Sequence, residues 1–221
     1  MNISVRSTAR LLGAGLRALL VLSVVCGVLY PLAVTGLGQA LFPHQANGSE
    51  ITSNGKVVGS ALIGQRYDLP LKKGEETPAP DLKWFQPRPS NGLGTNSVNT
   101  RYQLILSGAT NRAGDNAELI QWIKDAKAAV IRDNSVDGHR VRPSDVPPDA
   151  VTSSGSGLDP AISPEYADLQ VPRVAKLNGL DEAAVQRLVD RHTDGRVLGF
   201  VGEPQVNVLK LNIALKALDE T

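Results

Sequence analysis

The longest apolar run of the chain lies near its N-terminus. Residues 18–37 read ALLVLSVVCGVLYPLAVTGL, twenty positions without a charged side chain. At a rise of 1.5 Å per residue, a helix of this length spans roughly 30 Å, which is the thickness of the hydrocarbon core of a bilayer. The pattern therefore predicts one transmembrane helix over residues 18–41.

The charges around this run predict its orientation. Arg6, Arg10 and Arg17 precede it, and the first acidic residue is Glu50. By the positive-inside rule, residues 1–17 form a cytoplasmic arm and residues 42–221 an extracytoplasmic domain at the cell membrane. A cleaved signal peptide is the alternative, because Gly38-Gln39-Ala40 resembles a small-x-small cleavage site.

A proline interrupts the apolar run. Pro31 lacks a backbone N–H and therefore frees a carbonyl one turn earlier, which neighbouring helices or water must satisfy in lipid. One interpretation is a simple kink. The other is a surface for close packing of partner helices, in which Gly27, Pro31, Gly36 and Gly38 let the helices approach and Tyr30 is a further packing residue.

Alternating and turn-rich patterns follow the span. Asn54-Gly55 is a preferred type I′ turn and KVVGSALIG follows it, so we expect strands near 49–53 and 56–63. The next fifty residues are rich in Gly, Pro, Asn and Ser. Such a long irregular segment usually binds a ligand or lies against a partner.

Helical spacing returns after this segment. Asp115 or Asn116 caps a predicted helix that ends near Arg132, with one apolar stripe: Leu119, Ile120, Ile123, Ala126, Val130 and Ile131. The polar, proline-containing residues 134–150 form a loop or a boundary between two lobes.

The C-terminal part alternates helices and strands. Ser163-Pro164-Glu165 is a helix start, and Pro172 limits or kinks that helix. Asp181 caps a helix that runs to about His192, with Gly195 as its terminator. A strand RVLGFVG and a helix after Pro204 complete the chain. The predicted fold class is α+β: one transmembrane helix followed by a single mixed domain.

Composition excludes several classes of function. With 23 basic and 22 acidic residues, the chain has no electrostatic footprint for nucleic acid. Cys26 is the single cysteine, so no intrachain disulfide forms. The three histidines, His44, His139 and His192, lack partners at ligand spacing, and we expect neither a metal nor a prosthetic group.

The loop SSGSGLDPAISP, residues 153–164, is the strongest candidate for chemistry. A dinucleotide-binding loop would have glycine where Pro160 stands, a nucleophile elbow would have glycines two residues from Ser156, and a P-loop would have a lysine. A tight turn remains, formed by the motif loop: Ser156, Gly157, Leu158, Asp159 and Pro160. The nearby acids Asp145, Asp149 and Asp159 could form a general acid and base pair, although their spacing fixes no geometry.

Long blocks of this sequence resemble the C subunit family of the Kdp-type potassium-transporting ATPase. The resemblance rests on LYPLAVTGLGQALFPHQANGS, VVGSALIGQ, RPS at 88–90, VTSSGSGLDPAISPEYADLQVPRVAKLNGL and LGFVGEPQVNVLKLNIAL, in that order. Two departures lie in and at the end of the expanded segment 66–115. SGATNRAGDN, residues 107–116, replaces a Ser-Gly-Gly-Ser-Asn-like block, and RYDLPLKKGEETPAPDLKWF is longer than usual.

The resemblance implies an accessory, non-catalytic subunit of a high-affinity, ATP-driven potassium uptake complex. Its partners would be an ATP-hydrolysing P-type subunit, a channel-like potassium-translocating subunit, a small single-helix subunit and the bilayer. It further implies a catalytic chaperone that raises the ATP affinity of the hydrolysing subunit, with ATP as a transient ligand at Gln170. The predicted orientation conflicts with a direct contact, because it places Gln170 outside and ATP is hydrolysed inside.

Two other functions fit parts of the sequence. The serine- and aspartate-rich loop could belong to a membrane-anchored envelope hydrolase. Cleavage near Ala40 would instead release a secreted binding domain.

Overall fold

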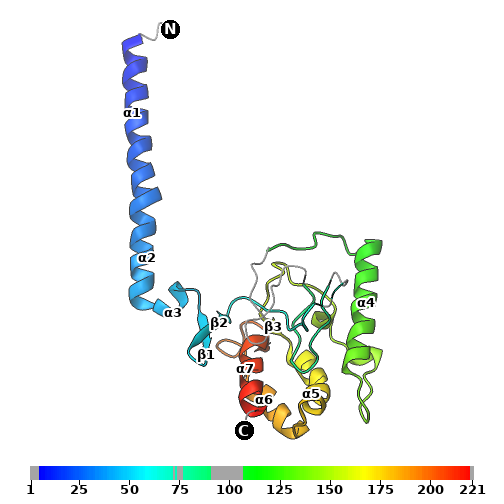
Figure 1. Ribbon diagram of the computed structural model, residues 1–221. Helices are drawn as coiled ribbons and strands as arrows, with labels where there is room; N and C mark the ends of the chain where they lie inside the picture. The colour runs from blue at the N-terminus through cyan, green and yellow to red at the C-terminus, as the bar shows by residue number, and fades with distance from the viewer. Residues whose placement is uncertain (1–4, 72, 74–76, 91–106, 220–221) are drawn as a thin grey trace. The chain divides into compact units, whose positions relative to one another are not determined.

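The computed structural model describes residues 5–71, 73, 77–90 and 107–219. It divides into two compact units, Met1–Ser49 and Glu50–Thr221. The first unit is almost entirely helical: α1 (Val5–Val24), a π-helical turn η1 (Val25–Leu29), α2 (Tyr30–Leu41) and the short α3 (Pro43–Ala46). Ser7–Leu41 is the one helix among the described residues that is long and apolar enough to cross a membrane (Figure 1).

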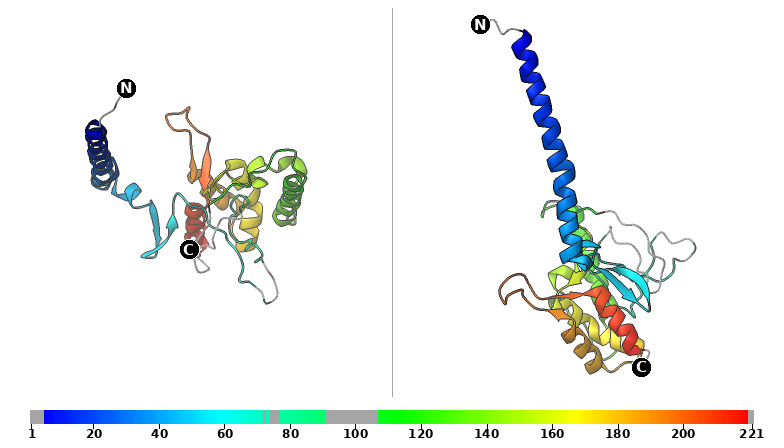
Figure 2. Two further views of the ribbon diagram at one scale, coloured as in Figure 1. Left: turned by 90° about the horizontal axis from the view of Figure 1, so that it is seen from above. Right: turned by 90° about the vertical axis from the view of Figure 1, so that its left-hand side faces the viewer.

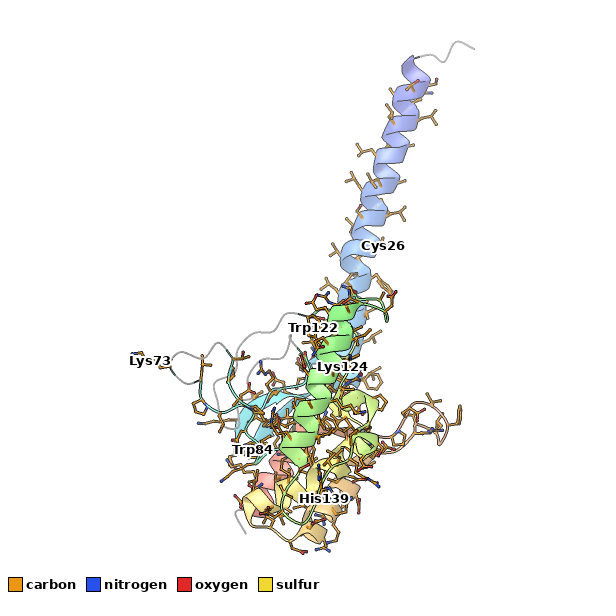
Figure 3. The ribbon with its side chains drawn as sticks, turned by 90° about the vertical axis from the view of Figure 1, so that its right-hand side faces the viewer. Cys26, Lys73, Trp84, Trp122, Lys124 and His139 are labelled. Atoms are coloured by element: carbon orange, nitrogen blue, oxygen red, sulfur yellow. The ribbon has the colours of Figure 1, made fainter. Side chains whose placement is uncertain are left out.

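Pro31 is the second residue of α2, and Tyr30 separates it from the π-helical turn. Within this turn the N–H of Tyr30 donates to the carbonyl of Val25, five residues earlier. Cys26 lies in the same turn (Figure 3). The helix thus accommodates the missing N–H of Pro31 by widening one turn and continuing, which is a recognised use of π-bulges.

The second unit begins with the expected hairpin. Strands β1 (Glu50–Ser53) and β2 (Lys56–Ser60) pair antiparallel, and Asn54 and Gly55 join them with φ of 51° and 75°. Both central residues have positive φ, as a type I′ turn requires. The hairpin prediction is confirmed, although β2 ends at Ser60 rather than at residue 63.

Helix α4 (Ala117–Asn134) begins where predicted and ends two residues later. The side chain of Asn116 caps it by accepting from the N–H groups of Glu118 and Leu119. Within its apolar stripe Val130 is buried and Ile120 is exposed, while the other members are partly buried: Leu119, Ile123, Ala126 and Ile131. Trp122, labelled on α4 in Figure 3, stacks under the guanidinium of Arg112, 4.5 Å from the ring centroid.

A small antiparallel sheet has the order β3-β5-β4 (Ala161–Ile162, Gln205–Asn207, Thr193–Asp194). Ile162 and Thr193 both pair with Val206 of the central strand. The predicted strand RVLGFVG is wrong, since residues 196–202 form the loop of a hairpin with one bridge, Val197 to Val201. This loop projects from the rest of its unit (Figure 2).

Three helices supply most of the core of this unit. They are α5 (Pro164–Asn178), α6 (Glu182–Arg191) and α7 (Val208–Asp219), and Ser163 and Asp181 cap the first two as predicted. Two 3-10 turns, η2 (Pro143–Asp145) and η3 (Pro148–Ala150), precede them. The largest fully buried apolar side chains lie mainly on these helices: Val171, Val174, Val185, Val189, Leu209, Leu211 and Leu215, with Tyr67 and Phe85 from the preceding segment.

Three local predictions about these helices are corrected. Pro172 does not limit α5, which continues to Asn178 because buried side chains on both sides of the proline hold it against the core. Gly179, with φ of 66°, ends α5, while His192 rather than Gly195 ends α6. Helix α7 begins at Val208 and not directly after Pro204, because Gln205–Asn207 is the central strand. The mixture of helices and strands confirms the α+β class.

Candidate functional site

The conformation of the motif loop is stabilised by hydrogen bonds between its backbone and nearby serine hydroxyls. The N–H of Gly157 donates to Oγ of Ser154 (3.0 Å), and the N–H of Leu158 donates to Oγ of Ser156 (3.1 Å). Hydroxyl groups that accept from backbone N–H groups two or three residues later are typical of Ser turns. The predicted tight turn is confirmed, and Ser156 serves it.

The loop also binds segments that are distant in sequence. The carbonyl of Leu158 accepts from the N–H of Gly64 (2.8 Å), that of Pro160 from the N–H of Val208 (3.0 Å), and that of Ser156 from the N–H of Gly108 (2.9 Å). The hydroxyl of Ser90 donates to the carbonyl of Gly157. The motif loop thus links four parts of the domain through hydrogen bonds: the segment after β2, the start of α7, and the segments that contain Ser90 and Gly108.

Asp159 anchors one side of the loop. Its Oδ2 forms an ion pair with Nη1 of Arg88 (2.8 Å), and its Oδ1 accepts from the N–H of Ala161 (3.0 Å). Nε of Arg88 also faces the carbonyl of Thr152. Arg88 belongs to the RPS block, so two separate sequence blocks meet here.

An open depression of about 320 Å³ lies beside this ion pair. Arg88, Asp149, Asp159, Ser163, Glu203 and Gln205 contribute its polar lining. Both oxygens of Asp149 accept from Ser163, one from its N–H (2.7 Å) and one from its hydroxyl (2.8 Å).

The three acids considered as a general acid and base pair are thus held by different partners. Asp145 belongs to a separate ion pair with Arg142, which lowers its pKa to about 2 by hydrogen bonding from the guanidinium. Among the described residues, no group of three His, Cys, Asp or Glu side chains is placed to hold a metal ion.

Gln170 lies on α5 and is fully buried, with 0% of its surface exposed. Its Oε1 accepts from the N–H of Gln86 (2.7 Å) and from Nη2 of Arg173 (2.7 Å), while its Nε2 donates to the carbonyl of Gln86 (3.1 Å). Both ends of the amide are therefore bound to the segment that leads to Arg88. A direct ligand at this side chain would have to displace that segment.

Asn212 on α7 binds the backbone of Phe85 in the same way as Gln170 binds the backbone of the next residue, Gln86. The N–H of Phe85 donates to its Oδ1 (2.9 Å), and its Nδ2 donates to the carbonyl of Phe85 (2.9 Å). Successive residues of an extended chain point their polar groups to opposite sides. The backbone N–H and carbonyl groups of residues 85 and 86 thus bind two side-chain amides, one on each side of the chain, where a sheet would offer them neighbouring strands.

Arg173 organises the same segment from the buried side. Its guanidinium donates to Oδ1 of Asn134 (2.8 Å) and to the carbonyls of Leu82 and Trp84. Burial lowers its pKa to about 10. Arg173, Asn134 and Asn212 were not among the predicted site residues, although polar residues at core-facing positions of an apolar helical stripe are a signal for such a network.

The predicted packing residues of the membrane helix all lie on the described helix. Cβ atoms added at Gly27 and Gly36 would meet nothing within 4 Å, and Tyr30 is exposed. The surface around Pro31 is therefore open, and its packing against partner helices stays a prediction.

Comparison with known proteins finds similar sequences over nearly the whole chain. Residues 12–217 match the family model described as K+-transporting ATPase, c chain. A relative from Streptomyces avermitilis, named potassium-transporting ATPase KdpC subunit, is 76% identical over 221 residues, covering 100% of both chains. Relatives with the same name from Streptomyces coelicolor (72% over 218 residues, 99% of this chain and 97% of the relative) and Kineococcus radiotolerans (42% over 217 residues, 98% of each) are also similar.

These matches cover both the apolar helix and the folded unit with its motif loop. The family suggested by the sequence blocks is therefore confirmed, and the chain belongs to the KdpC family, the c chain of potassium-transporting ATPases.

Proposed function

We propose that this chain is an accessory, non-hydrolysing subunit that stabilises an ATP-driven potassium uptake complex. It would be anchored by the apolar helix Ser7–Leu41, with the N-terminus cytoplasmic and the folded domain outside. The partners would be the ATP-hydrolysing P-type subunit and the channel-like potassium-translocating subunit, with a small single-helix subunit beside them. The domain would cover the outer mouth of the channel-like subunit.

One observation carries this proposal. The polar side chains of the family blocks bind to other groups of the domain. Ser156 accepts a hydrogen bond within its own turn, Asp159 pairs with Arg88, and Gln170 binds the backbone of Gln86. A hydrolase that uses a serine nucleophile needs that serine and a neighbouring base free to act on a substrate. A domain whose polar side chains are bound internally is better suited to act as a rigid docking partner than to carry an active site.

The effect on ATP affinity is proposed to act through assembly. A subunit that binds the ATP-competent conformation of its partner raises the apparent ATP affinity by mass action, without touching the nucleotide. Gln170 would then contribute by fixing the shape of the domain. This mechanism is compatible with a domain outside the membrane.

The first test is co-expression of the whole complex with and without this chain. Wild-type chain extracted in mild detergent should retain the other subunits, and its omission should lower complex yield or raise the KM for ATP of potassium-stimulated hydrolysis. A full-yield complex with unchanged KM in its absence would refute the proposed role.

Orientation is tested with two single-cysteine chains. Cys26→Ser removes the native thiol, and either Thr8→Cys or Ala128→Cys, both at exposed positions, introduces a new one. A membrane-impermeant maleimide added to intact cells should label position 128 and not position 8. The reverse pattern would place the domain inside.

A further inference from the structure

The hairpin loop between β4 and β5 exposes four large apolar side chains. Val197 is 66% exposed, Leu198 83%, Phe200 73% and Val201 49%. Single exposed apolar residues are ordinary, but a contiguous apolar patch at a projecting tip marks an interaction site. The loop stands away from the rest of its unit in both views of Figure 2.

The backbone of this tip is also strained. Leu198 and Gly199, the two central residues of the turn, have φ of 54° and 80°. The N–H of Phe200 donates to the carbonyl of Val197, which closes the turn. A bulky side chain at positive φ is disfavoured by contact of its Cβ with the backbone, and such outliers cluster at sites of function.

The first hairpin of the same chain supplies an internal comparison. Its two-residue turn also has two successive residues at positive φ, 51° and 75°, and it carries Asn54-Gly55 there, the residues that this geometry favours. The second turn carries Leu198-Gly199 instead. A leucine at positive φ improves neither the turn nor solubility, and its exposed side chain is free to make a contact with another molecule.

The flanking charges argue against a bilayer as the main contact. Residues 197–202 contain no Trp, Tyr, Lys or Arg, which are the residues that anchor a segment at a lipid interface. At the base of the loop, Arg196 pairs with Glu203 (2.8 Å), so the arginine is already neutralised. A fixed turn that presents one leucine fits a shaped apolar pocket better than fluid lipid.

We propose that the hairpin tip, residues 197–201, docks into an apolar pocket on another protein subunit of the transport complex. Leu198 and Phe200 are the anchors, and the Arg196–Glu203 pair forms the polar rim of the contact. This inference rests on the proposed function, since it requires a stable partner chain.

The first experiment compares Leu198→Asn with wild-type full-length chain in the co-expressed complex. Asn restores the residue that the first hairpin uses, so the variant should melt at the same temperature as wild type or higher. Loss of the leucine from its proposed pocket should nevertheless reduce the partner subunits retained after detergent extraction by about tenfold or more. Leu62→Asn, at a residue that is 63% exposed outside the tip, is the matched control and should retain them fully.

The second experiment does not depend on stability. A photo-crosslinking benzophenone amino acid replaces Phe200, or Leu62 as control, in the assembled complex. Adducts from position 200 to one partner chain would support the proposal. Lipid adducts alone, or no adducts above those of the control, would overturn it, as would partner retention within about twofold of wild type for Leu198→Asn. If wild-type chain retains no partner at all, the proposed function fails first.

Discussion

The side-chain amide of Gln170 forms two hydrogen bonds with the backbone of Gln86, which is 84 positions away in sequence. Its Oε1 accepts from the N–H of Gln86, and its Nε2 donates to the carbonyl of Gln86. Arg173 adds a third bond to the same amide. The residue for which the family resemblance implies a nucleotide contact is thus placed at the centre of an internal network. Its substitution is expected to act first on the fold of the domain.

Gln170→Leu should destabilise the domain by about 2–3 kcal/mol, because the backbone N–H and carbonyl of Gln86 and one N–H of the Arg173 guanidinium lose their partner. Asn212→Leu removes the equivalent pair from Phe85 and is the matched control. Urea unfolding of the purified chains measures both. If the two variants change the KM for ATP of the complex alike, Gln170 acts through the fold; a change with Gln170→Leu alone would indicate a nucleotide contact.

Arg173→Lys should be nearly as destabilising as Arg173→Ala, although lysine keeps the charge. The guanidinium reaches Asn134, Gln170 and two backbone carbonyls in different directions, which a single ammonium cannot do. Loss of a buried, fully bonded cation typically costs about 3 kcal/mol or more. Thermal melting of the three chains tests this, and near-wild-type stability of Arg173→Lys would contradict it.

Gly157→Ala should weaken the motif loop, whereas Gly155→Ala should not. Gly157 has φ of 69°, and a Cβ there would lie 2.9 Å from the carbonyl oxygen of Gly108. A Cβ at Gly155 would meet nothing within 4 Å. We expect a loss of about 1–3 kcal/mol for the first variant, measured by urea unfolding. Equal stability of both variants would show that the loop yields without cost.

The sequence identified features that depend on neighbouring residues. The Asn54-Gly55 turn and the caps Asn116, Ser163 and Asp181 need only contacts within three positions, so local patterns reveal them. The motif loop could likewise be recognised as a turn from its own serines and glycine. The α+β class followed from these elements.

Features that depend on distant partners could not be read in this way. Strand β5 has three residues and exists because it pairs with β3 and β4, so the apolar letters after Pro204 suggested helix instead. RVLGFVG has the composition of a strand but lacks a partner along most of its length. Arg88 meets Asp159 across 71 positions, and no local pattern encodes that contact.

The ion pair between Asp145 and Arg142 should make part of the stability depend on pH. Hydrogen bonds from Arg142 lower the pKa of Asp145 to about 2, below the value of about 4 expected in the unfolded chain. A lowered pKa in the folded state means that the contribution is present above about pH 4 and disappears as the pH falls toward 2. Asp145→Asn should therefore melt below wild type at pH 7, and the gap should close between about pH 4 and 2. Because the pair is exposed, added salt should narrow the gap as well. A melting difference that persists unchanged at pH 2 would instead assign the effect to the uncharged hydrogen bond at the start of η2.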